Sequence, residues 1–450
     1  MRFLLQPGGS VTGQIRVPGD KSISHRSIML GAIAEGVTDI SGFLEGEDAL
    51  STLNAFRAMG VKIEGPDNGK VRVHGVGLHG LQAPAAPLDM GNSGTSMRLL
   101  AGLLAGQKFS ATLIGDVSLS KRPMERVAKP LRLMGAVVET QEGGRPPLVI
   151  KGEGKLTGIH YDLPMASAQV KSCLLLAGLY ANGETSVTEP APTRDHTERM
   201  LSGFGYAVER RGNATCAVKS GGKLVATSID VPADISSATF FMVAAAIAPG
   251  SDITLTHVGI NPTRIGAINI LQLMGADLTV SNRREVGGEP VADIRVRYAP
   301  LHGIDIPEEQ VPLAIDEFPA LFIAAACAEG RTVLRGAEEL RVKESDRIQV
   351  MADGLHTLGI AATPTPDGIV IEGASATGPV FGGGPIFGGG RIYSHHDHRI
   401  AMSFAVASLR AGAPIHIEGC DNVATSFPNF VELAQRAGMH IQAQADEAQH

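Results

Sequence analysis

The chain has 450 residues, of which 44% are hydrophobic, so it can build packed cores and is long enough for two or more domains. Its net charge of −7 argues against a nucleic-acid-binding protein, and it has no apolar run of the roughly 18 residues that a membrane span needs. Tryptophan is absent and aromatic residues make up 4%, so we expect cores of Ala, Leu, Val, Ile and Met. The four cysteines lack C-x-x-C spacing, which predicts buried thiols in a reducing, cytoplasmic setting rather than a zinc or redox site: Cys173, Cys216, Cys327 and Cys420.

A pattern of two helices, each ending at a glycine, recurs six times along the chain. The first helix of each unit is rich in Ala, Leu and Met, and the second is amphipathic. Strand-like alternation follows each helix, so one unit predicts a β-α-β-α-β-β order over about 70 to 80 residues. We expect the glycines to end the helices in the left-handed conformation. They are Gly36, Gly106, Gly183, Gly250, Gly330 and Gly412 after the first helix, and Gly60, Gly135, Gly205, Gly275, Gly359 and Gly438 after the second.

Units of this size are larger than most solenoid repeats, so we expect two lobes of three units each, divided between the third and the fourth unit. The segment from Val231 to Asp234 carries a proline ahead of the fourth unit's first helix, and it is the predicted crossover between the lobes.

The first segment with chemical potential is Pro18 to Ser27, at the start of the first unit. Lys21 and Arg26 lie in the first turns of a predicted helix that Ser22 or Ser24 can cap. Backbone N–H groups, hydroxyls and two cations suit a phosphate or a carboxylate. The alternative is an ordinary capped helix with solvated charges, and the segment alone does not decide between the two.

Two further segments of the first half have the same character. Asp89 to Arg98 places Asn92 and Gly94 before the second unit's helix, where glycine lets a ligand approach the backbone; a tight turn with a helix cap is the alternative. Ser120 to Arg126 includes Arg122, whose guanidinium offers two parallel donors to an anion. A solvated basic turn is the alternative there.

The second half adds carboxylates to the cations. In the segment from Glu338 to Arg347, Lys343 and Arg347 are four residues apart, which predicts one shared helix face with Glu344 between them as an acid or base. A surface salt-bridge network is the alternative. Asp316 precedes an apolar helix, as a general base or as a cap. Tyr393 to Arg399 opens the sixth unit's first helix, and its histidines lack the spacing of a metal site.

The cationic segments recur at one phase of the repeat, at or before the first helix of a unit. Equal phase in quasi-symmetric lobes means the same end of each lobe, where helix dipoles add to the charge of Lys and Arg. The predicted ligand is therefore a small polyanion. Neither a Walker motif nor a G-x-G-x-x-G motif follows a strand, so nucleotide binding is not indicated.

These segments resemble the enolpyruvyl transferases, and within that family the members that act on shikimate 3-phosphate. GDKSISHRS, GNSGTSMR, RPMER, RVKESDR and HDHR match the family's motifs in order across nearly the whole chain. The resemblance implies an α/β fold of two inverse α/β barrel-like lobes, each of three β-α-β-α-β-β units. Lobe 1 would comprise residues 1–20 and 235–450, and lobe 2 residues 21–234, with the active site in the cleft between them.

The resemblance also implies the reaction, which is transfer of the enolpyruvyl group of phosphoenolpyruvate to the 5-hydroxyl of shikimate 3-phosphate with release of phosphate. Asp316, Glu344 and Lys21 would be catalytic: Asp316 takes the hydroxyl proton, and Glu344 with Lys21 protonates the methylene carbon. Shikimate 3-phosphate would be bound by Lys21, Ser22, Arg26, Ser167, Ala168, Gln169, Arg194, Asp316 and Lys343. Phosphoenolpyruvate would be bound by Lys21, Asn92, Gly94, Arg122, Gln169, Arg347 and Arg399.

Other expectations follow from the same resemblance. No metal and no organic cofactor is expected, and neither is a nucleic-acid or membrane partner; we expect a cytoplasmic monomer that glyphosate inhibits. Ala168 stands where many members have Ser, and Thr425 where some have Lys; both changes occur in the branch that carries TRDHT. Two alternatives remain: a UDP-N-acetylglucosamine enolpyruvyl transferase, whose loop cysteine has no counterpart between Leu119 and Arg126, and a non-catalytic polyanion-binding repeat protein, which has no use for Asp316 and Glu344.

Overall fold

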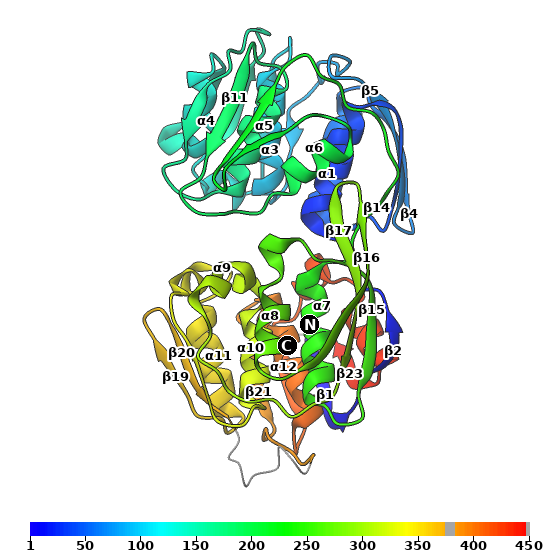
Figure 1. Cartoon of the computed structure of the whole chain (residues 1–450), viewed down its shortest axis with the longest axis vertical. Helices are drawn as coiled ribbons and strands as arrows, with labels where there is room; N and C mark the ends of the chain where they lie inside the picture. Colours follow the sequence, from blue (N-terminus) through cyan, green and yellow to red (C-terminus); the bar gives the residue numbers. More distant parts are fainter. Residues whose placement is uncertain (374–382, 447–450) are drawn as a thin grey trace. The chain divides into compact units, whose positions relative to one another are not determined.

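The computed structural model of the chain describes residues 1–373 and 383–446 and divides it into two compact units (Figure 1). Unit 1 comprises Met1–Pro18, Ala233–Arg284 and Val291–His450, and unit 2 comprises Gly19–Pro232 and Glu285–Pro290. The main divisions therefore fall two residues before those expected from the sequence. The assignment of the short segment Glu285–Pro290 to unit 2 was not anticipated.

Unit 2 consists of three modules that share one plan. In the second and third modules the strand before the first helix runs parallel to the strand after it, and in the first module a strand from the end of the unit takes that place. In all three modules the last two strands form an antiparallel hairpin. The sheet orders are β14-β3-β5-β4, β6-β7-β9-β8 and β10-β11-β13-β12. The elements are α1 (Lys21–Ala32), β3 (Glu35–Ser41), α2 (Glu47–Ala58), β4 (Lys62–Asp67), β5 (Lys70–Val76), β6 (Leu88–Asp89), α3 (Gly94–Ala105), β7 (Ala111–Ile114), η1 (Leu119–Lys121), α4 (Glu125–Leu133), β8 (Val137–Gln141), η2 (Glu142–Gly144), β9 (Arg145–Lys151), β10 (His160–Asp162), α5 (Ala168–Gly178), β11 (Glu184–Thr188), α6 (His196–Gly203), β12 (Glu209–Arg211), β13 (Thr215–Lys219) and β14 (Ile229–Asp230).

Unit 1 repeats the plan with sheet orders β16-β17-β15-β2, β18-β20-β19 and β21-β22-β1-β23. Its elements are β1 (Arg2–Gly9), β2 (Thr12–Ile15), α7 (Ile235–Ile247), β15 (Asp252–Gly259), η3 (Pro262–Arg264), α8 (Gly266–Leu273), β16 (Asp277–Val286), β17 (Glu289–Arg297), η4 (Glu308–Gln310), α9 (Val311–Ala314), η5 (Ile315–Glu317), α10 (Phe318–Ala326), β18 (Arg331–Leu334), η6 (Glu338–Val342), α11 (Arg347–Thr357), β19 (Ala362–Thr365), β20 (Gly368–Glu372), β21 (Gly390–Tyr393), α12 (His398–Ala407), η7 (Ser408–Arg410), β22 (Ile415–Glu418), α13 (Val423–Ser426), α14 (Phe430–Ala437) and β23 (Met439–Gln444). The predicted β-α-β-α-β-β order is confirmed within one stretch of chain in the second and third modules. The first, fourth and sixth modules complete it with a strand from elsewhere in the chain, and the fifth sheet has three strands among the described residues.

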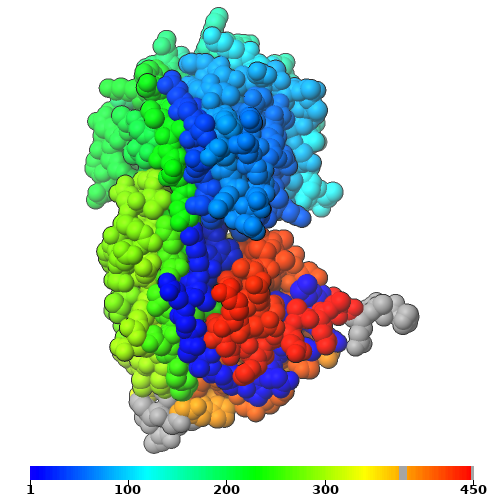
Figure 2. Space-filling view, turned by 90° about the vertical axis from the view of Figure 1, so that its right-hand side faces the viewer, coloured from blue at the N-terminus to red at the C-terminus, as the bar shows by residue number. Residues whose placement is uncertain are grey.

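Segments distant in the sequence complete the first and the last module. β14, at the end of unit 2's main segment, occupies the first place of the first sheet beside β3. β1 occupies the place of the last strand in the sixth sheet, between β22 and β23. Figure 2 shows this N-terminal segment in blue beside the C-terminal segment in red. In each unit, a strand from one end of the unit's sequence therefore completes a sheet formed at the other end.

The glycines after the second helices have the predicted conformation, and those after the first helices follow it only in part. Each of the six later glycines, from Gly60 to Gly438, has a positive φ between 81° and 123°. Gly106, in contrast, ends α3 with φ −87°, so its conformation does not require glycine. A Cβ at Gly106 would lie 2.4 Å from the ring of Tyr180, and this close contact is why no larger residue fits.

The first helices of the modules form the centre of each unit. In unit 1, α7, α10 and α12 are mutually packed, and every residue of α7 is buried. In unit 2, α3 and α5 approach so closely that a Cβ at Gly102 would lie 2.0 Å from the carbonyl oxygen of Cys173. Small residues therefore let the backbones come together, and polar N-terminal residues of these helices gather at one end of each unit.

The cores are largely aliphatic, with one exception that composition did not predict. Phe241, Phe427 and Phe430 pack with Phe3 and Phe240 in unit 1, and the rings of Phe427 and Phe430 are 5.3 Å apart in an edge-to-face arrangement. The four cysteines are buried free thiols, as expected. Within residues 1–373 and 383–446, no helix has both the length and the apolar character needed to cross a membrane.

Candidate active site

The N-terminus of α1 carries the first predicted anion-binding residues of unit 2. Asp20, rather than Ser22 or Ser24, caps the helix: its carboxylate accepts a hydrogen bond from the Ile23 N–H at 2.9 Å. Ser24 Oγ instead accepts from the backbone N–H of Leu44. Lys21 is half-exposed and forms an ion pair with Asp48. The predicted capping residues were therefore wrong, while Lys21 is a half-exposed cation at a helix N-terminus.

Arg26 is buried one turn further along α1 and is fixed from three directions. Its Nε donates to Thr197 Oγ1 at 2.8 Å, its Nη2 to Ser172 Oγ at 3.2 Å and its Nη1 to the carbonyl oxygen of Ser22 at 3.0 Å. Burial lowers the pKa of Arg26 to about 10, with opposing contributions from nearby carboxylates. The guanidinium still carries its charge at neutral pH, so α1 holds a buried, hydrogen-bonded cation next to half-exposed Lys21.

The N-termini of α3 and α5 bring a second group of predicted residues together. Ser93 and Ser167 cap these helices by accepting from the Ser96 and Val170 N–H groups. A Cβ at Gly94 would lie 2.9 Å from Arg98 Nη1 and 3.1 Å from Arg122 Nη1, so two guanidiniums lie directly over this glycine. Arg98 was not predicted as a site residue.

Gln169 belongs to the same group through its contacts with α3. Its Oε1 accepts from Arg98 Nη1 at 2.6 Å, and its Nε2 donates to Thr95 Oγ1 at 2.9 Å. The pKa of Arg98 is lowered by burial and by the charges of Arg122 and Arg126. Arg98 and Arg122, held this close at the N-terminus of α3, are an arrangement suited to an anion.

Three further predicted residues of unit 2, Asn92, Ala168 and Arg194, differ from one another in their surroundings. Asn92 is exposed, and its side-chain amide donates to Asp116 Oδ2 at 3.0 Å. Ala168 is the first residue of α5, directly after the cap Ser167. Arg194 is half-buried in the loop between β11 and α6, and its neighbour Asp195 accepts from Arg199 and Arg210 at 3.0 Å each.

In unit 1, Asp316 lies among three cations. It belongs to η5, and its Oδ1 is 3.7 Å from Lys343 Nζ and 3.6 Å from Arg347 Nη1. Arg399 Nη1 donates to the backbone carbonyl oxygen of Asp316 at 3.1 Å. The cap of α10 is Glu317, without a side-chain capping bond, so the interpretation of Asp316 as a helix cap was wrong.

Arg347 connects the two predicted carboxylates of unit 1. Its Nη2 donates to Glu344 Oε2 at 2.6 Å. Its Nη1 is buried 3.6 Å from Asp316 and has no hydrogen-bond partner among the residues that the structure describes. Lys343 precedes α11, which begins at Arg347, so the predicted shared helix face was wrong. Both cations reach Asp316 nonetheless, because the chain turns between them.

Arg347 is itself held by Asp397, which was not among the predicted site residues. Asp397, fully buried, accepts from Arg347 Nε at 2.9 Å and from Ser345 Oγ at 2.8 Å. Burial by itself would raise the pKa of Asp397, but the hydrogen bond and charge of Arg347 hold it below the usual value. Asp397 also caps α12 through the Arg399 N–H, as the helix start predicted there requires.

Two further titratable groups, Glu317 and His398, directly follow Asp316 and Asp397 in the chain. Burial, followed by the charge of Asp316, raises the pKa of Glu317, which accepts a hydrogen bond from Ser236 Oγ at 2.7 Å. Burial and the charge of Arg399 lower the pKa of His398 to about 3, so its imidazole is neutral. Residues 1–373 and 383–446 contain no group of three or more His, Cys, Asp or Glu side chains that could hold a metal ion.

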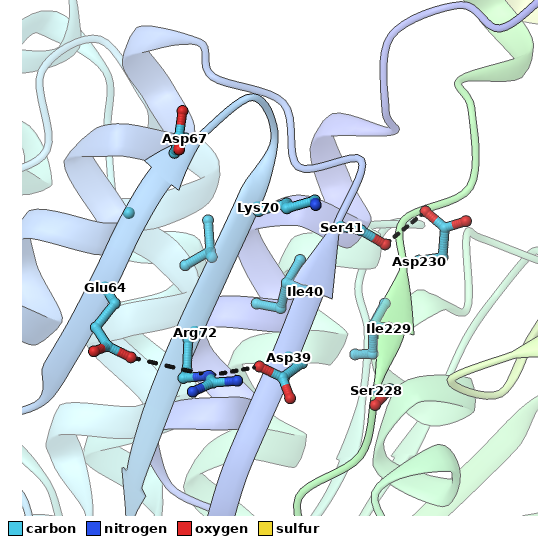
Figure 3. Close-up of a pocket in the computed structure, with 12 residues that line it drawn as sticks. Asp39, Ile40, Ser41, Glu64, Asp67, Lys70, Arg72, Ser228, Ile229 and Asp230 are labelled. Atoms are coloured by element: carbon cyan, nitrogen blue, oxygen red, sulfur yellow. Dashed lines mark hydrogen bonds and ion pairs between the residues drawn. The ribbon is translucent and has the colours of Figure 1, made fainter.

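A cavity of about 490 Å³ lies elsewhere in unit 2, on the sheet β14-β3-β5-β4 (Figure 3). Arg72 lies between Asp39 and Glu64 on this sheet, at 2.8 Å and 3.9 Å, and Ser41 Oγ donates to Asp230 at 2.9 Å. None of the predicted site residues lines this cavity. Its arginine, Arg72, is paired with two carboxylates, in contrast to the closely spaced arginines around Gly94.

Arg98 and Asp397, the two residues of these clusters that were not predicted, each have a recognisable signal in the sequence. Arg98 follows Gly94 by four residues and therefore lies above it on one face of α3. Asp397 stands directly before α12 in HDHR, at a position typical of helix caps. Its second role, holding Arg347 from 50 residues away, needs the folded structure.

The fold and these two charged clusters are those of a class of transferases, the two-unit enolpyruvyl transferases. Similarity to known proteins identifies the family within that class. The enolpyruvyl transferase NikO of Streptomyces tendae shares the fold, with a TM-score of 0.78 at 18% identity over 99% of each chain. A sequence profile described as EPSP synthase (3-phosphoshikimate 1-carboxyvinyltransferase) matches residues 5–433. The 3-phosphoshikimate 1-carboxyvinyltransferase of Methylococcus capsulatus is 69% identical over 440 residues, 98% of each chain.

A solved EPSP synthase of Acinetobacter baumannii has a TM-score of 0.95 and 66% identity to this chain, over 98% of this chain and 100% of that one. The chain belongs to the EPSP synthase family. The resemblance and the fold class predicted from the sequence are thereby confirmed.

Proposed function

We propose that this chain is a 3-phosphoshikimate 1-carboxyvinyltransferase, which transfers the enolpyruvyl group of phosphoenolpyruvate to the 5-hydroxyl of shikimate 3-phosphate. The observation that carries the proposal is 69% identity over 98% of both chains to a relative of that name. Its substrates are small anions, in keeping with the arginine clusters of both units. No metal or organic cofactor takes part.

The reaction proceeds by addition and elimination. The 5-hydroxyl oxygen bonds to C2 of phosphoenolpyruvate while its proton leaves, and a proton adds to the methylene carbon C3. A C3 proton is then removed, the C2–O bond to phosphate breaks, and inorganic phosphate departs with the electron pair. One group must accept the hydroxyl proton and another must donate to carbon, and both roles reverse in the second step.

We assign these proton transfers to Asp316, Glu344 and Lys21. Asp316 and Glu344 lie on either side of Arg347, so two carboxylates contact one buried guanidinium that is itself suited to hold an anion. Lys343 lies next to Asp316 and would bind the acceptor's hydroxyl region. Buried Arg347 and half-buried Arg399, both beside Asp316, would bind phosphoenolpyruvate.

Unit 2 would supply most of the substrate binding. Arg26, Lys21, Ser22, the α5 start at Ser167 to Gln169, and Arg194 would hold shikimate 3-phosphate. Asn92, Gly94, Arg122 and Gln169 would contact phosphoenolpyruvate, with Lys21 serving both ligands. The grouping of Gly94, Arg122 and Gln169 around Arg98 supports this assignment.

Phosphate release from phosphoenolpyruvate tests the function directly. We expect release with shikimate 3-phosphate as the acceptor, undiminished by a chelator, and none with UDP-N-acetylglucosamine. Release only with the UDP-sugar would assign the chain to the other enolpyruvyl transferase. Binding of both anions without any release would indicate a non-catalytic protein. Gel filtration and cell fractionation test the proposed monomeric state and cytoplasmic location.

A further inference from the structure

Unit 2 contains a buried lysine outside the predicted site. Lys171 lies in the second turn of α5, and its side chain is 1% exposed. Its Nζ is 2.9 Å from Glu189 Oε1 and 3.0 Å from Glu198 Oε2, and both carboxylates are largely buried. A buried charge is costly unless it is paired, so this cluster of one cation and two anions needs a reason to exist.

The cluster joins the two ends of the loop that carries Arg194. Glu189 lies at the start of this loop, directly after β11, and Glu198 lies in the first turn of α6, just beyond its end. Thr193 Oγ1, next to Arg194, donates a hydrogen bond to the same Glu189 oxygen that contacts Lys171. Lys171 therefore binds both ends of the loop to α5, and Glu189 passes that constraint to the residue before Arg194.

The cluster also adjoins the hydroxyls that hold Arg26. Ser172 and Thr197 are the chain neighbours of Lys171 and Glu198, and Thr197 Oγ1 donates to Ser172 Oγ at 2.8 Å. The α5–α6 contact thus consists of an ion pair beside a hydroxyl pair, and Arg26 donates to both hydroxyls. Although burial by itself would lower it, the pKa of Lys171 is raised by Glu198 and Glu189, so the lysine is charged at neutral pH.

We propose that Lys171 is a positioning residue for substrate phosphate recognition, which holds the Arg194 loop in place through Glu189 and Glu198. The inference rests on the proposed function, because it takes the phosphate group of shikimate 3-phosphate as the ligand of Arg194. Lys171 does not touch the ligand. It orders the loop in advance, so that binding does not have to supply the ordering free energy.

A double-mutant cycle tests whether the cluster acts through Arg194. Glu189→Ala removes the link to Thr193 and leaves Lys171 paired with Glu198, so the fold keeps a balanced buried pair. We expect Glu189→Ala to raise the KM for shikimate 3-phosphate roughly tenfold, with kcat and the KM for phosphoenolpyruvate changed less than about twofold. In an Arg194→Ala background, Glu189→Ala should add less than about a twofold further change.

Lys171→Met is the second variant, and it should show the same selectivity with a larger effect. If it does not fold, Glu189→Ala still decides the question. Arg211→Met, which removes exposed ion pairs with Glu184 and Glu209 in the same unit, is the matched control and should leave all constants unchanged. Additive effects in the cycle, or equal losses for both substrates, would overturn the proposal. A wild-type protein without transferase activity would instead defeat the proposed function.

Discussion

Arg98 Nη1 donates a hydrogen bond to Gln169 Oε1 at 2.6 Å and thereby joins the N-terminal turns of α3 and α5. Gln169 is a predicted ligand of both substrates, whereas Arg98 was not selected from the sequence. The contact orients the Gln169 amide, because its nitrogen must then face Thr95, as the 2.9 Å hydrogen bond to Thr95 Oγ1 shows. Arg98 therefore fixes which polar atom Gln169 can offer to a ligand.

Arg98→Leu should weaken phosphoenolpyruvate binding more than it slows turnover. A hydrogen bond to a charged group is worth about 1.5–3 kcal/mol, so we expect the KM for phosphoenolpyruvate to rise roughly 10- to 100-fold. Gln169→Leu should have a similar effect, and the double variant should be little worse than either single one. Independent, multiplying losses would show that the two side chains act separately.

Asp316→Asn and Glu344→Gln should abolish most turnover while both substrates still bind. General acid–base groups contribute about 10²–10⁴-fold, so kcat should fall by that range with KM changed only a few-fold. Steady-state phosphate release and calorimetric binding measure the two quantities separately. Glu338→Gln, an exposed carboxylate in the same segment, is the control. If binding were lost and kcat kept, these residues would be ligands rather than acid and base.

Glyphosate should inhibit the wild-type enzyme in competition with phosphoenolpyruvate, and Gly94→Ala should weaken that inhibition. The added Cβ would lie 2.9 Å from Arg98 Nη1 and 3.1 Å from Arg122 Nη1, which forces the flexible guanidinium ends to move. The fold should tolerate this, so the melting temperature should stay within a few degrees of wild type. Inhibition curves at fixed phosphoenolpyruvate measure the effect. Full wild-type activity at millimolar glyphosate would contradict the prediction.

Glu317 should make the stability of unit 1 fall as the pH rises. Its pKa is above the ordinary value of 4.5 in the folded protein, so from about pH 4.5 upward the unfolded chain loses a proton that the folded chain keeps. Stability then decreases by at most about 1.4 kcal/mol per pH unit until the folded pKa is passed. Glu317→Gln cannot ionise and retains an oxygen that can accept from Ser236.

Chemical denaturation at several pH values compares the two proteins. The stability of Glu317→Gln relative to wild type should increase between pH 4.5 and the folded pKa and then level off. A constant difference across the pH range would show that Glu317 has the same pKa in the folded and unfolded states and would contradict the prediction.

The local part of the fold was predictable, because glycine and helix periodicity act over a few residues. Gly60 and its five counterparts have the left-handed conformation that their positions required. The closure of the sixth sheet by β1 was not predictable, since a strand's partner more than 400 residues away leaves no local pattern. The cationic helix starts were found because charge beside glycine is visible in the sequence.

The polar residues that were missed depend, like the closure of the sixth sheet by β1, on contacts between distant parts of the sequence. Lys171 is the one charged residue in AQVKSCLLLAG, an otherwise mostly apolar helix, and that oddity could have marked it as a buried, paired charge. Its partners Glu189 and Glu198 lie outside the helix, so only the folded chain identifies them. Asp397 was recognised as part of a helix start, but its bond to Arg347 depends on how α11 and α12 are brought together.

The place of β1 between β22 and β23 also bears on biosynthesis. The strand leaves the ribosome early and then waits while about 400 further residues are added, for tens of seconds at ordinary elongation rates. The main segment of unit 2, from Gly19 to Pro232, is complete long before that. During this period β1 lacks both of its partner strands, and a chaperone that bound it would keep its two buried side chains, Phe3 and Leu5, from aggregating.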